Sequence, residues 1–287
     1  MAVTLRQLTD SAQRKLAALY GDGEARWLIR LVMEHEKGWN QVELVIRANQ
    51  EVSDFIVGRV NEVVDRLIAG EPIQYIYGDT YWYGMTLSVN PSVLIPRPET
   101  EELVDIIVKA HDDSDLKVLD VCTGSGCIAV ALAKTLKFPE VTAIDISADA
   151  LDVACQNAAG QKVAVDFVRR DALLLASDTV ATNASKYDII VSNPPYVMDS
   201  EKSAMERNVI DHEPHIALFV PDSDSLKFYK AIATYAETAL TARGRLYFEL
   251  NPLTADELRS WMISKGWDDV RIIPDIHARK RFLVASR

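Results

Sequence analysis

The sequence lacks the long apolar run that a membrane-spanning helix needs. No stretch reaches the roughly 18 consecutive apolar residues of such a span, and the N-terminus has no basic-then-apolar signal pattern. Cysteine is also scarce: Cys122, Cys127 and Cys155 include no CxxC pair and form no second cluster. Isolated cysteines of this kind are typical of reduced, small core residues. We therefore expect a cytoplasmic protein that has no membrane partner.

The chain has no excess of basic residues in either of its parts. Lys and Arg number 31 against 42 Asp and Glu, which gives a net charge of −11. Residues 1–80 contain 9 of these basic and 12 of these acidic side chains, which leaves 22 and 30 for the remainder. Because affinity for duplex nucleic acid depends on phosphate neutralisation, we expect no direct nucleic-acid binding. A cationic small molecule or a basic protein partner fits this charge better.

A chain of 287 residues is long enough for two domains. In residues 1–72, apolar side chains recur at helical spacing, as in Glu24–His35 and Asp54–Ile68, and predict a small helical bundle. Residues 73–95 are rich in Tyr and Trp with glycines at turn points, which predicts a β-hairpin that links the two domains. Residues 96–287 then form the second domain.

In the second domain, predicted strands alternate with predicted helices. This alternation is typical of right-handed βαβ units and of a sheet that helices cover on both faces. Because no helix separates the last two strands, the final strand should run antiparallel. The sequence thus predicts an α/β fold with a Rossmann-like, mostly parallel, seven-stranded sheet, and a surface loop at Ser177–Ser185. The predicted strands are Lys117–Cys122, Val141–Ile146, Val163–Val168, Tyr187–Ser192, Arg245–Leu250, Val270–Ile273 and Arg281–Ala285.

The stretch from Asp188 to Tyr196 is a short apolar run that ends in two prolines. The run predicts a buried strand, and Pro194 and Pro195 can neither continue it nor donate a backbone hydrogen bond. The Asn193 side-chain oxygen and the Pro194 carbonyl are then two fixed acceptors, which suit an NH2 group with its two donors. Tyr196 adds a flat face on which a planar group could stack. A tight turn after a buried strand is the simpler interpretation of the motif alone.

A glycine-rich loop follows the first predicted strand of this domain. It contains Gly124 and Gly126, which let the backbone approach a ligand closely at the start of the next helix. This loop alone is shared by dinucleotide-binding and S-adenosylmethionine-binding proteins. The acidic residues Asp120, Asp145 and Asp171 at three strand ends favour a sulfonium cation over a pyrophosphate. Asp145 is placed to accept from ribose hydroxyls, and Asp171 to accept from an adenine amine, so S-adenosylmethionine is the predicted cofactor.

Four further polar residues have more than one interpretation. Arg97 could reach an anion or a carboxylate, or lie on the surface of a linker. Thr100 can cap a helix whose first turn carries acids. Glu213 could line a substrate crevice or form a surface ion pair, and Glu249 could be a crevice acid or a capping residue. A His-Glu-Pro-His stretch contains Glu213, but its proline prevents a regular helix and no third ligand is evident, so we predict no metal site.

Together, these motifs resemble those of class I S-adenosylmethionine-dependent methyltransferases that modify a planar NH2 group. More narrowly, the chain resembles the release factor glutamine methyltransferases (the HemK/PrmC family), through segments outside the generic core: Pro72–Tyr75, Leu94–Glu101 and Glu213–Leu218. The resemblance covers most of residues 70–287, whereas the N-terminal bundle fits in position, size and helical character.

The resemblance implies methyl transfer from S-adenosylmethionine to the side-chain amide nitrogen (N5) of the glutamine in the Gly-Gly-Gln motif of peptide chain release factors. S-adenosylhomocysteine is then the second product, release factors are the protein partners in translation termination, and the N-terminal bundle is the docking domain. The implied catalytic residues are Asn193, Pro194 and Tyr196, and Pro195 joins them in substrate binding. The implied cofactor-binding residues are Asp120, Cys122, Thr123, Gly124, Ser125, Gly126, Asp145, Asp171, Ala172 and Asn193.

The chain departs from the family pattern at two places. The family usually has glycine where this chain has Cys122. A small cysteine should fit there if its φ is negative, whereas a positive φ would put the loop geometry in doubt. The segment 275–281 follows the family only loosely, and we assign it no role. The alternative activity is N6-methylation of adenine in DNA or RNA, because adenine offers the same planar NH2 group. A catalytically silent, cofactor-binding partner protein is a second alternative, which the intact motif from Asn193 to Tyr196 disfavours.

Overall fold

The computed structural model describes residues 3–177 and 186–287, so most of the predicted loop at Ser177–Ser185 lies outside the described residues. The chain divides into two compact units. One unit comprises residues 1–78 together with 206–212, and the other comprises residues 79–205 together with 213–287. The boundary at residues 78 and 79 therefore divides the predicted hairpin 73–95 between the units, and a short segment from the second half of the sequence belongs to the first unit.

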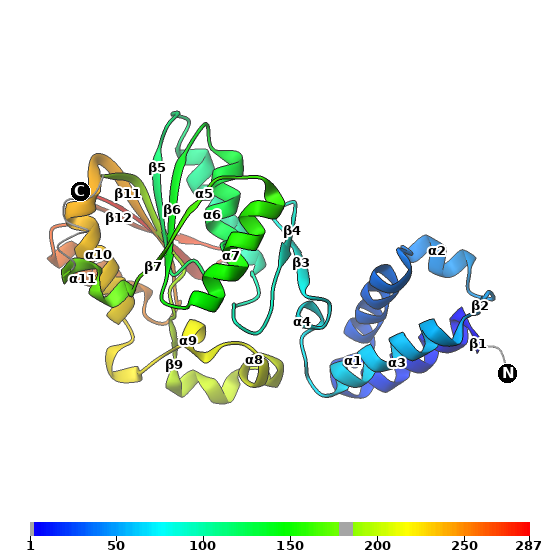
Figure 1. Ribbon diagram of the computed structural model, residues 1–287. Helices are drawn as coiled ribbons and strands as arrows, with labels where there is room; N and C mark the ends of the chain where they lie inside the picture. The colour runs from blue at the N-terminus through cyan, green and yellow to red at the C-terminus, as the bar shows by residue number, and fades with distance from the viewer. Residues whose placement is uncertain (1–2, 178–185) are drawn as a thin grey trace. The chain divides into compact units, whose positions relative to one another are not determined.

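The first unit is helical, as its periodicity predicts (Figure 1). Its longest helix is capped by Thr4, whose hydroxyl accepts from the Gln7 amide, and Gly21 interrupts it with a non-helical backbone. Leu16, Val32 and Val60 are fully buried in the core between the helices. The elements are β1 (Val3–Thr4), α1 (Leu5–Lys37), α2 (Gln41–Ile46), β2 (Glu51–Val52), α3 (Asp54–Ile68), α4 (Ile73–Tyr77) and α8 (Arg207–His212).

Helix α4 corrects the sequence prediction, which placed its residues in the hairpin. Pro72 lies at the N-cap of α4, and Gly78 ends the helix in the left-handed region with φ 80°. A proline before the first turn and a glycine after the last are favourable at these positions, and they outweigh the β propensity of the tyrosines between them. The antiparallel hairpin itself is shorter than predicted and pairs β3 (Asp79–Trp82) with β4 (Met85–Ser88).

The second unit contains the predicted seven-stranded sheet, with strand order β12-β13-β11-β8-β5-β6-β7. Strands β11, β8, β5, β6 and β7 pair in parallel, and β13 is antiparallel to both of its neighbours, as predicted. The strands are β5 (Lys117–Val121), β6 (Glu140–Asp145), β7 (Asp166–Arg169), β8 (Tyr187–Ser192), β11 (Leu240–Glu249), β12 (Asp269–Pro274) and β13 (Lys280–Ser286).

Helices cover both faces of this sheet (Figure 1). On β8, Ile190 packs in the core beneath α10 and α11, whereas its neighbours Ile189 and Val191 pack in the core beneath α5 and α6. A central strand buried on both faces is therefore apolar without interruption, because successive side chains alternate between the faces. The helices are α5 (Pro98–Ala110), α6 (Cys127–Thr135), α7 (Ala148–Gln161), α9 (His215–Leu218), α10 (Lys227–Ala239) and α11 (Ala255–Ser264).

The remaining elements lie in the connections of the second unit. Two short parallel strands, β9 (Val197–Met198) and β10 (Phe219–Val220), pair outside the main sheet. In the part of the chain that the structure describes, 3-10 helices occupy residues 172–177, 199–204 and 222–224. Among the described residues, no helix combines the length and the hydropathy that crossing a bilayer would require.

Candidate active site

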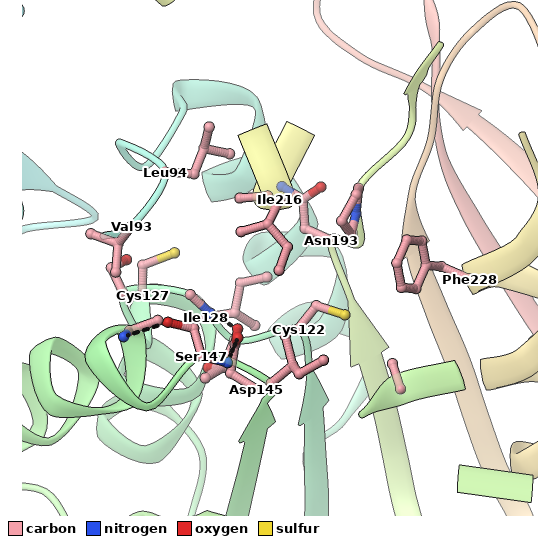
Figure 2. Close-up of a pocket in the computed structure, with 18 of the residues that line it drawn as sticks. Val93, Leu94, Cys122, Cys127, Ile128, Asp145, Ser147, Asn193, Ile216 and Phe228 are labelled. Atoms are coloured by element: carbon pink, nitrogen blue, oxygen red, sulfur yellow. Dashed lines mark hydrogen bonds between the residues drawn. The ribbon is translucent and has the colours of Figure 1, made fainter. Parts of the chain in front are cut away.

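One pocket lies at the carboxyl ends of the parallel strands, where open α/β sheets bind their ligands. Asp145 and Ser147 approach it from the end of β6, and Asn193 approaches it from the end of β8 on another side (Figure 2). Nine residues predicted from the sequence line this pocket: Cys122, Thr123, Gly124, Ser125, Asp145, Asp171, Ala172, Asn193 and Pro195. The structure thus brings together most of the predicted site. Asp120, Gly126, Pro194 and Tyr196 do not line it, although they belong to the same loops.

The glycine-rich loop has a backbone that only small residues can adopt. Gly124 and Gly126 have φ values of 55° and 76°. A Cβ at Gly126 would lie 2.9 Å from the Cβ of Ala154 in α7, closer than real Cβ atoms approach one another. The loop therefore packs tightly on α7 and leaves its outer surface to the pocket, which is the close backbone approach that the sequence predicted.

Asp120 supports the loop from below rather than facing the pocket. Its Oδ2 accepts from the Thr123 hydroxyl at 2.6 Å and from the Ala129 amide at 3.2 Å, and its side chain is fully buried. Its Oδ1 has no hydrogen-bond partner among the described residues. Burial, which disfavours the charged form, raises the pKa of Asp120 to about 7 despite the two hydrogen bonds.

The carboxylate of Asp145 faces the pocket and is held in a fixed orientation. Its Oδ2 accepts from the Gly124 amide and its Oδ1 from the Ser147 amide, both at 2.9 Å. Burial raises its pKa, and these backbone hydrogen bonds oppose that shift. Each oxygen keeps a further lone pair, so the carboxylate could accept from a pair of vicinal hydroxyls such as those of a ribose. Asp171 also lines the pocket and accepts from the Leu173 amide at 2.9 Å.

Of the two cases distinguished for Cys122, the structure shows the positive φ: its value is 61°, in the left-handed region. The chain turns sharply here from β5 into the loop, and the Cβ of a non-glycine residue costs about 1–2 kcal/mol in this conformation. The cysteine side chain lines the pocket and packs against the core beneath α10. Burial raises the pKa of its thiol well above the usual value, so the side chain is neutral at pH 7.

The Asn-Pro-Pro-Tyr loop leaves β8 with its side chains divided between the pocket and the core. The Asn193 side chain lines the pocket, and its Nδ2 donates to the Thr100 hydroxyl at 3.3 Å. The Tyr196 hydroxyl donates to Glu249 at 3.0 Å, and the Tyr196 carbonyl accepts from Asn251 at 3.1 Å. Tyr196 packs against the core cluster beneath α10 and α11.

Thr100 is not the helix cap that its sequence predicted. Pro98, whose fixed φ suits the first helical position, starts α5, so Arg97 is the N-cap and Thr100 lies inside the first turn. The Thr100 side chain points into the protein instead, where its hydroxyl donates to Glu249 at 2.7 Å. Glu249 therefore lies beneath the site, where it accepts from the first turn of α5 and from the loop after β8.

Arg97 and Glu213 form an ion pair at the edge of the pocket, with 2.5 Å between Nη2 and Oε1. Glu213 is buried and its second oxygen accepts from the Ile95 amide at 3.3 Å. The pair ties the segment before α5, which lines the pocket, to the start of α9, whose residues Ile216 and Ala217 also line it. The sequence left two interpretations open for each residue, and the structure shows Arg97 paired with a carboxylate and Glu213 in an ion pair that is buried. The family-like segments Leu94–Glu101 and Glu213–Leu218 contain these two residues. The additional lining residues include Val93, Leu94, Arg97, Ile216, Ala217 and Phe228.

Known families match both parts of the chain. Residues 7–78 match the PrmC N-terminal domain, and residues 99–216 match the methyltransferase small domain. A release factor glutamine methyltransferase of Bacteroides thetaiotaomicron is 39% identical over 283 residues, which cover 99% of this chain and 100% of that protein. The chain belongs to the release factor glutamine methyltransferase family.

A second member of the family, from Flavobacterium psychrophilum, is 38% identical and covers 93% of this chain and 94% of its own. A solved structure from Streptococcus mutans, assigned to the SAM-dependent methyltransferases, has a TM-score of 0.50 at 14% identity and covers 72% of this chain and 55% of its own. That likeness supports the fold alone. The fold and the enzyme class predicted from the sequence are confirmed.

The strain at position 122 of this methyltransferase can be tested by substitution. Cys122→Gly should change the free energy of unfolding by less than about 1 kcal/mol. Glycine relieves the strain of the left-handed φ, and this gain offsets the lost packing of the side chain and the greater entropy of the unfolded chain. Cys122→Val should cost about 2 kcal/mol or more, because a β-branched residue is disfavoured in that region. Urea denaturation gives both values.

The matched control for this substitution is Cys127→Val, at a buried cysteine inside helix α6. Valine there meets an ordinary helical backbone, so the loss should be smaller than for Cys122→Val. Equal losses at positions 122 and 127 would contradict the assignment of the cost to backbone strain.

The raised pKa of Asp120 predicts a pH-dependent stability. The folded protein keeps this carboxyl protonated up to about pH 7, whereas the unfolded chain releases the proton near pH 4. The contribution of Asp120 to stability is therefore present below pH 4 and is lost as pH rises through 7. Asp120→Asn, which stays neutral, should match the wild type at pH 4 and exceed it by about 4 kcal/mol at pH 8. Urea midpoints that differ equally at both pH values would refute this.

Proposed function

We propose that this chain transfers a methyl group from S-adenosylmethionine to the N5 amide nitrogen of the glutamine in the Gly-Gly-Gln motif of peptide chain release factors. The observation that carries the proposal is the orientation of Asn193. Its side-chain nitrogen is engaged by Thr100, which leaves its oxygen as an acceptor at the pocket. The names of the curated relatives support the same substrate class.

The residues around the pocket fit S-adenosylmethionine by their chemistry. The Asp145 carboxylate can accept from the ribose hydroxyls, Asp171 can accept from the adenine amine, and the loop at Gly124 allows close backbone contact. Val93, Leu94, Ile128 and Phe228 add apolar surface for the flat base and the aliphatic chain. When bound, the cofactor supplies an electrophilic methyl group on a sulfonium ion. The acidic strand ends favour a sulfonium cation over a pyrophosphate, and so favour this cofactor over a dinucleotide.

The acceptor nitrogen is a poor nucleophile, because its lone pair is delocalised into the carbonyl group. The Asn193 Oδ1 atom and the Pro194 carbonyl would accept from its two N–H groups, which raises electron density on nitrogen and holds it in line with the methyl group. Transfer forms the nitrogen–carbon bond as the carbon–sulfur bond breaks, and the surplus amide proton leaves to solvent. Asn193, Pro194 and Pro195 therefore act by orientation, and the loop offers no titratable base.

We divide the chain into an N-terminal domain (residues 1–72), a linking segment (73–95) and the methyltransferase domain (96–287). Docking of the release factor is assigned to the N-terminal domain. Helix α2 exposes Val42, Val45 and Ile46, with 64, 72 and 76% of their surface accessible. Neighbouring apolar side chains of this size on one short helix mark a protein-binding surface.

A cytoplasmic location follows from a substrate that acts in translation. No observation favours adenine methylation.

The division of roles within the site predicts opposite effects of two substitutions. Asn193→Ala should lower kcat at least about 1000-fold, because an acceptor that orients the reacting amide is lost, while the Kd for S-adenosylmethionine stays within about threefold. Asp145→Ala should raise that Kd about 10- to 100-fold, because hydrogen bonds to a carboxylate are lost. Methyl transfer from labelled cofactor and calorimetric titration give the two quantities.

If Asn193→Ala lost cofactor affinity in step with activity, this division of roles would be wrong. Incubation of the wild-type protein with labelled cofactor and either a release factor or DNA tests the substrate class itself. Label should appear in the release factor and not in the DNA. Label in DNA would replace the proposal by adenine methylation, and label in neither would favour the catalytically silent protein.

The proposed docking surface predicts a selective loss of affinity for the intact protein substrate. The double substitution Val45→Asp, Ile46→Asp should raise the KM for a release factor about tenfold, because apolar contact is replaced by charge. The KM for a short Gly-Gly-Gln peptide should change less than twofold. Phe138→Asp, at a residue of the second unit with 84% of its surface exposed, is the matched control and should change neither KM. Equal changes for protein and peptide would rule out docking on α2.

A further inference from the structure

A chain of buried hydrogen bonds runs from the last residue of β11 to the pocket. Glu249 and Thr100 have 1% and 2% of their surface exposed. The Thr100 hydroxyl donates to Glu249 Oε2 at 2.7 Å, and the Asn193 amide donates through Nδ2 to the Thr100 oxygen at 3.3 Å. Asn193 stands at the pocket end of this chain (Figure 2).

This series of hydrogen bonds has only one direction while Glu249 is ionised, because a carboxylate accepts but cannot donate. Burial raises the pKa of Glu249, and the hydrogen bonds from Thr100 and Tyr196 oppose that shift. The single proton of the Thr100 hydroxyl is committed to Glu249, so towards Asn193 the hydroxyl can only accept. Asn193 must therefore turn its NH2 group towards Thr100. The carboxamide oxygen is then left for a ligand, although the two ends of an amide have nearly the same shape.

Glu249 also holds the far end of the same loop. Its Oε1 accepts from the Tyr196 hydroxyl at 3.0 Å, three residues after Asn193. Both carboxylate oxygens are thus occupied by donors that position the Asn-Pro-Pro-Tyr loop. A carboxamide in place of this carboxylate could accept from Thr100 or from Tyr196, but it would present an NH2 group to the other.

We propose that Glu249, acting through Thr100, is a positioning residue that sets which end of the Asn193 carboxamide faces the substrate. The inference rests on the proposed function, in which the Asn193 oxygen accepts from the NH2 group of a glutamine. In the reversed orientation, Asn193 would direct its own NH2 group at the NH2 group of the glutamine. Two donors would then face one another, and the acceptor that aligns the reacting nitrogen would be lost.

The test compares kcat for release-factor methylation in Glu249→Gln and Thr100→Val with that in Thr100→Ser. In Glu249→Gln and Thr100→Val, kcat should fall about 100- to 1000-fold, as for the loss of a preorganised hydrogen-bond partner. Thr100→Val removes the link to Asn193, and Glu249→Gln no longer fixes the direction in which the Thr100 hydroxyl donates. Thr100→Ser keeps a hydroxyl at the same place and should stay within about fivefold of the wild type. The Kd for S-adenosylmethionine should change less than threefold in all three.

Asp188→Asn is the matched control, an acid-to-amide substitution at the opposite end of β8. Asp188 accepts from the Thr241 hydroxyl at 3.0 Å and from the Lys117 amide at 2.9 Å, so it resembles Glu249 in its partners but lies outside the pocket lining. Its kcat should equal that of the wild type even if its melting temperature falls. If Glu249 acted only by stabilising the fold, Glu249→Gln would lower the melting temperature and the cofactor affinity. Its kcat would then not differ from that of Asp188→Asn.

Two outcomes overturn the inference while leaving the proposed function intact. In the first, the wild-type protein methylates the release factor and the Glu249→Gln variant does so with an equal kcat. The second is a Thr100→Ser variant as impaired as Thr100→Val. If Glu249→Gln does not fold, the two Thr100 variants decide the question alone. A wild-type protein that leaves the release factor unlabelled would instead refute the proposed function.

Discussion

The buried carboxylate of Glu249 is the group on which the geometry of the active-site loop depends. Taking a carboxylate out of water is costly, and it is stable in a core only where donors satisfy its oxygens. Here those donors, Thr100 and Tyr196, come from the start of α5 and from the loop after β8. The same hydrogen bonds that offset the cost of burial therefore bring two distant segments to the pocket.

The sheet provides the rigid base for this arrangement. Strands β5, β6 and β8 end at the same edge, so the glycine-rich loop, Asp145 and Asn193 meet there although they are far apart in the sequence. Cores on both faces of the sheet hold these strand ends in place. The cost of a left-handed residue such as Cys122 is acceptable in this setting, because the packed strands on either side determine the turn.

Much of the second unit is predictable from local patterns. Apolar runs marked the strands, because a strand covered on both faces leaves no polar alternation, and the acidic strand ends marked the pocket. At the end of β8, two prolines also marked where the strand stops. The patterns failed where a neighbouring proline or glycine, or the packing of the strands, outweighed the preference that was read from the sequence. Ile73–Tyr77 forms a helix between Pro72 and Gly78, Thr100 turns inward instead of capping α5, and Cys122 adopts a positive φ.

The sequence by itself determined the fold class, the order of the strands and helices, and the loop types at the pocket, because these depend on periodicity, turn residues and short motifs. Only the tertiary structure decided which buried partners those loops acquire. Thr100 and Glu249 are 149 positions apart, and Arg97 and Glu213 are 116 apart. No local pattern encodes such pairings, since they arise when strands and helices pack and a buried charge must find its donors.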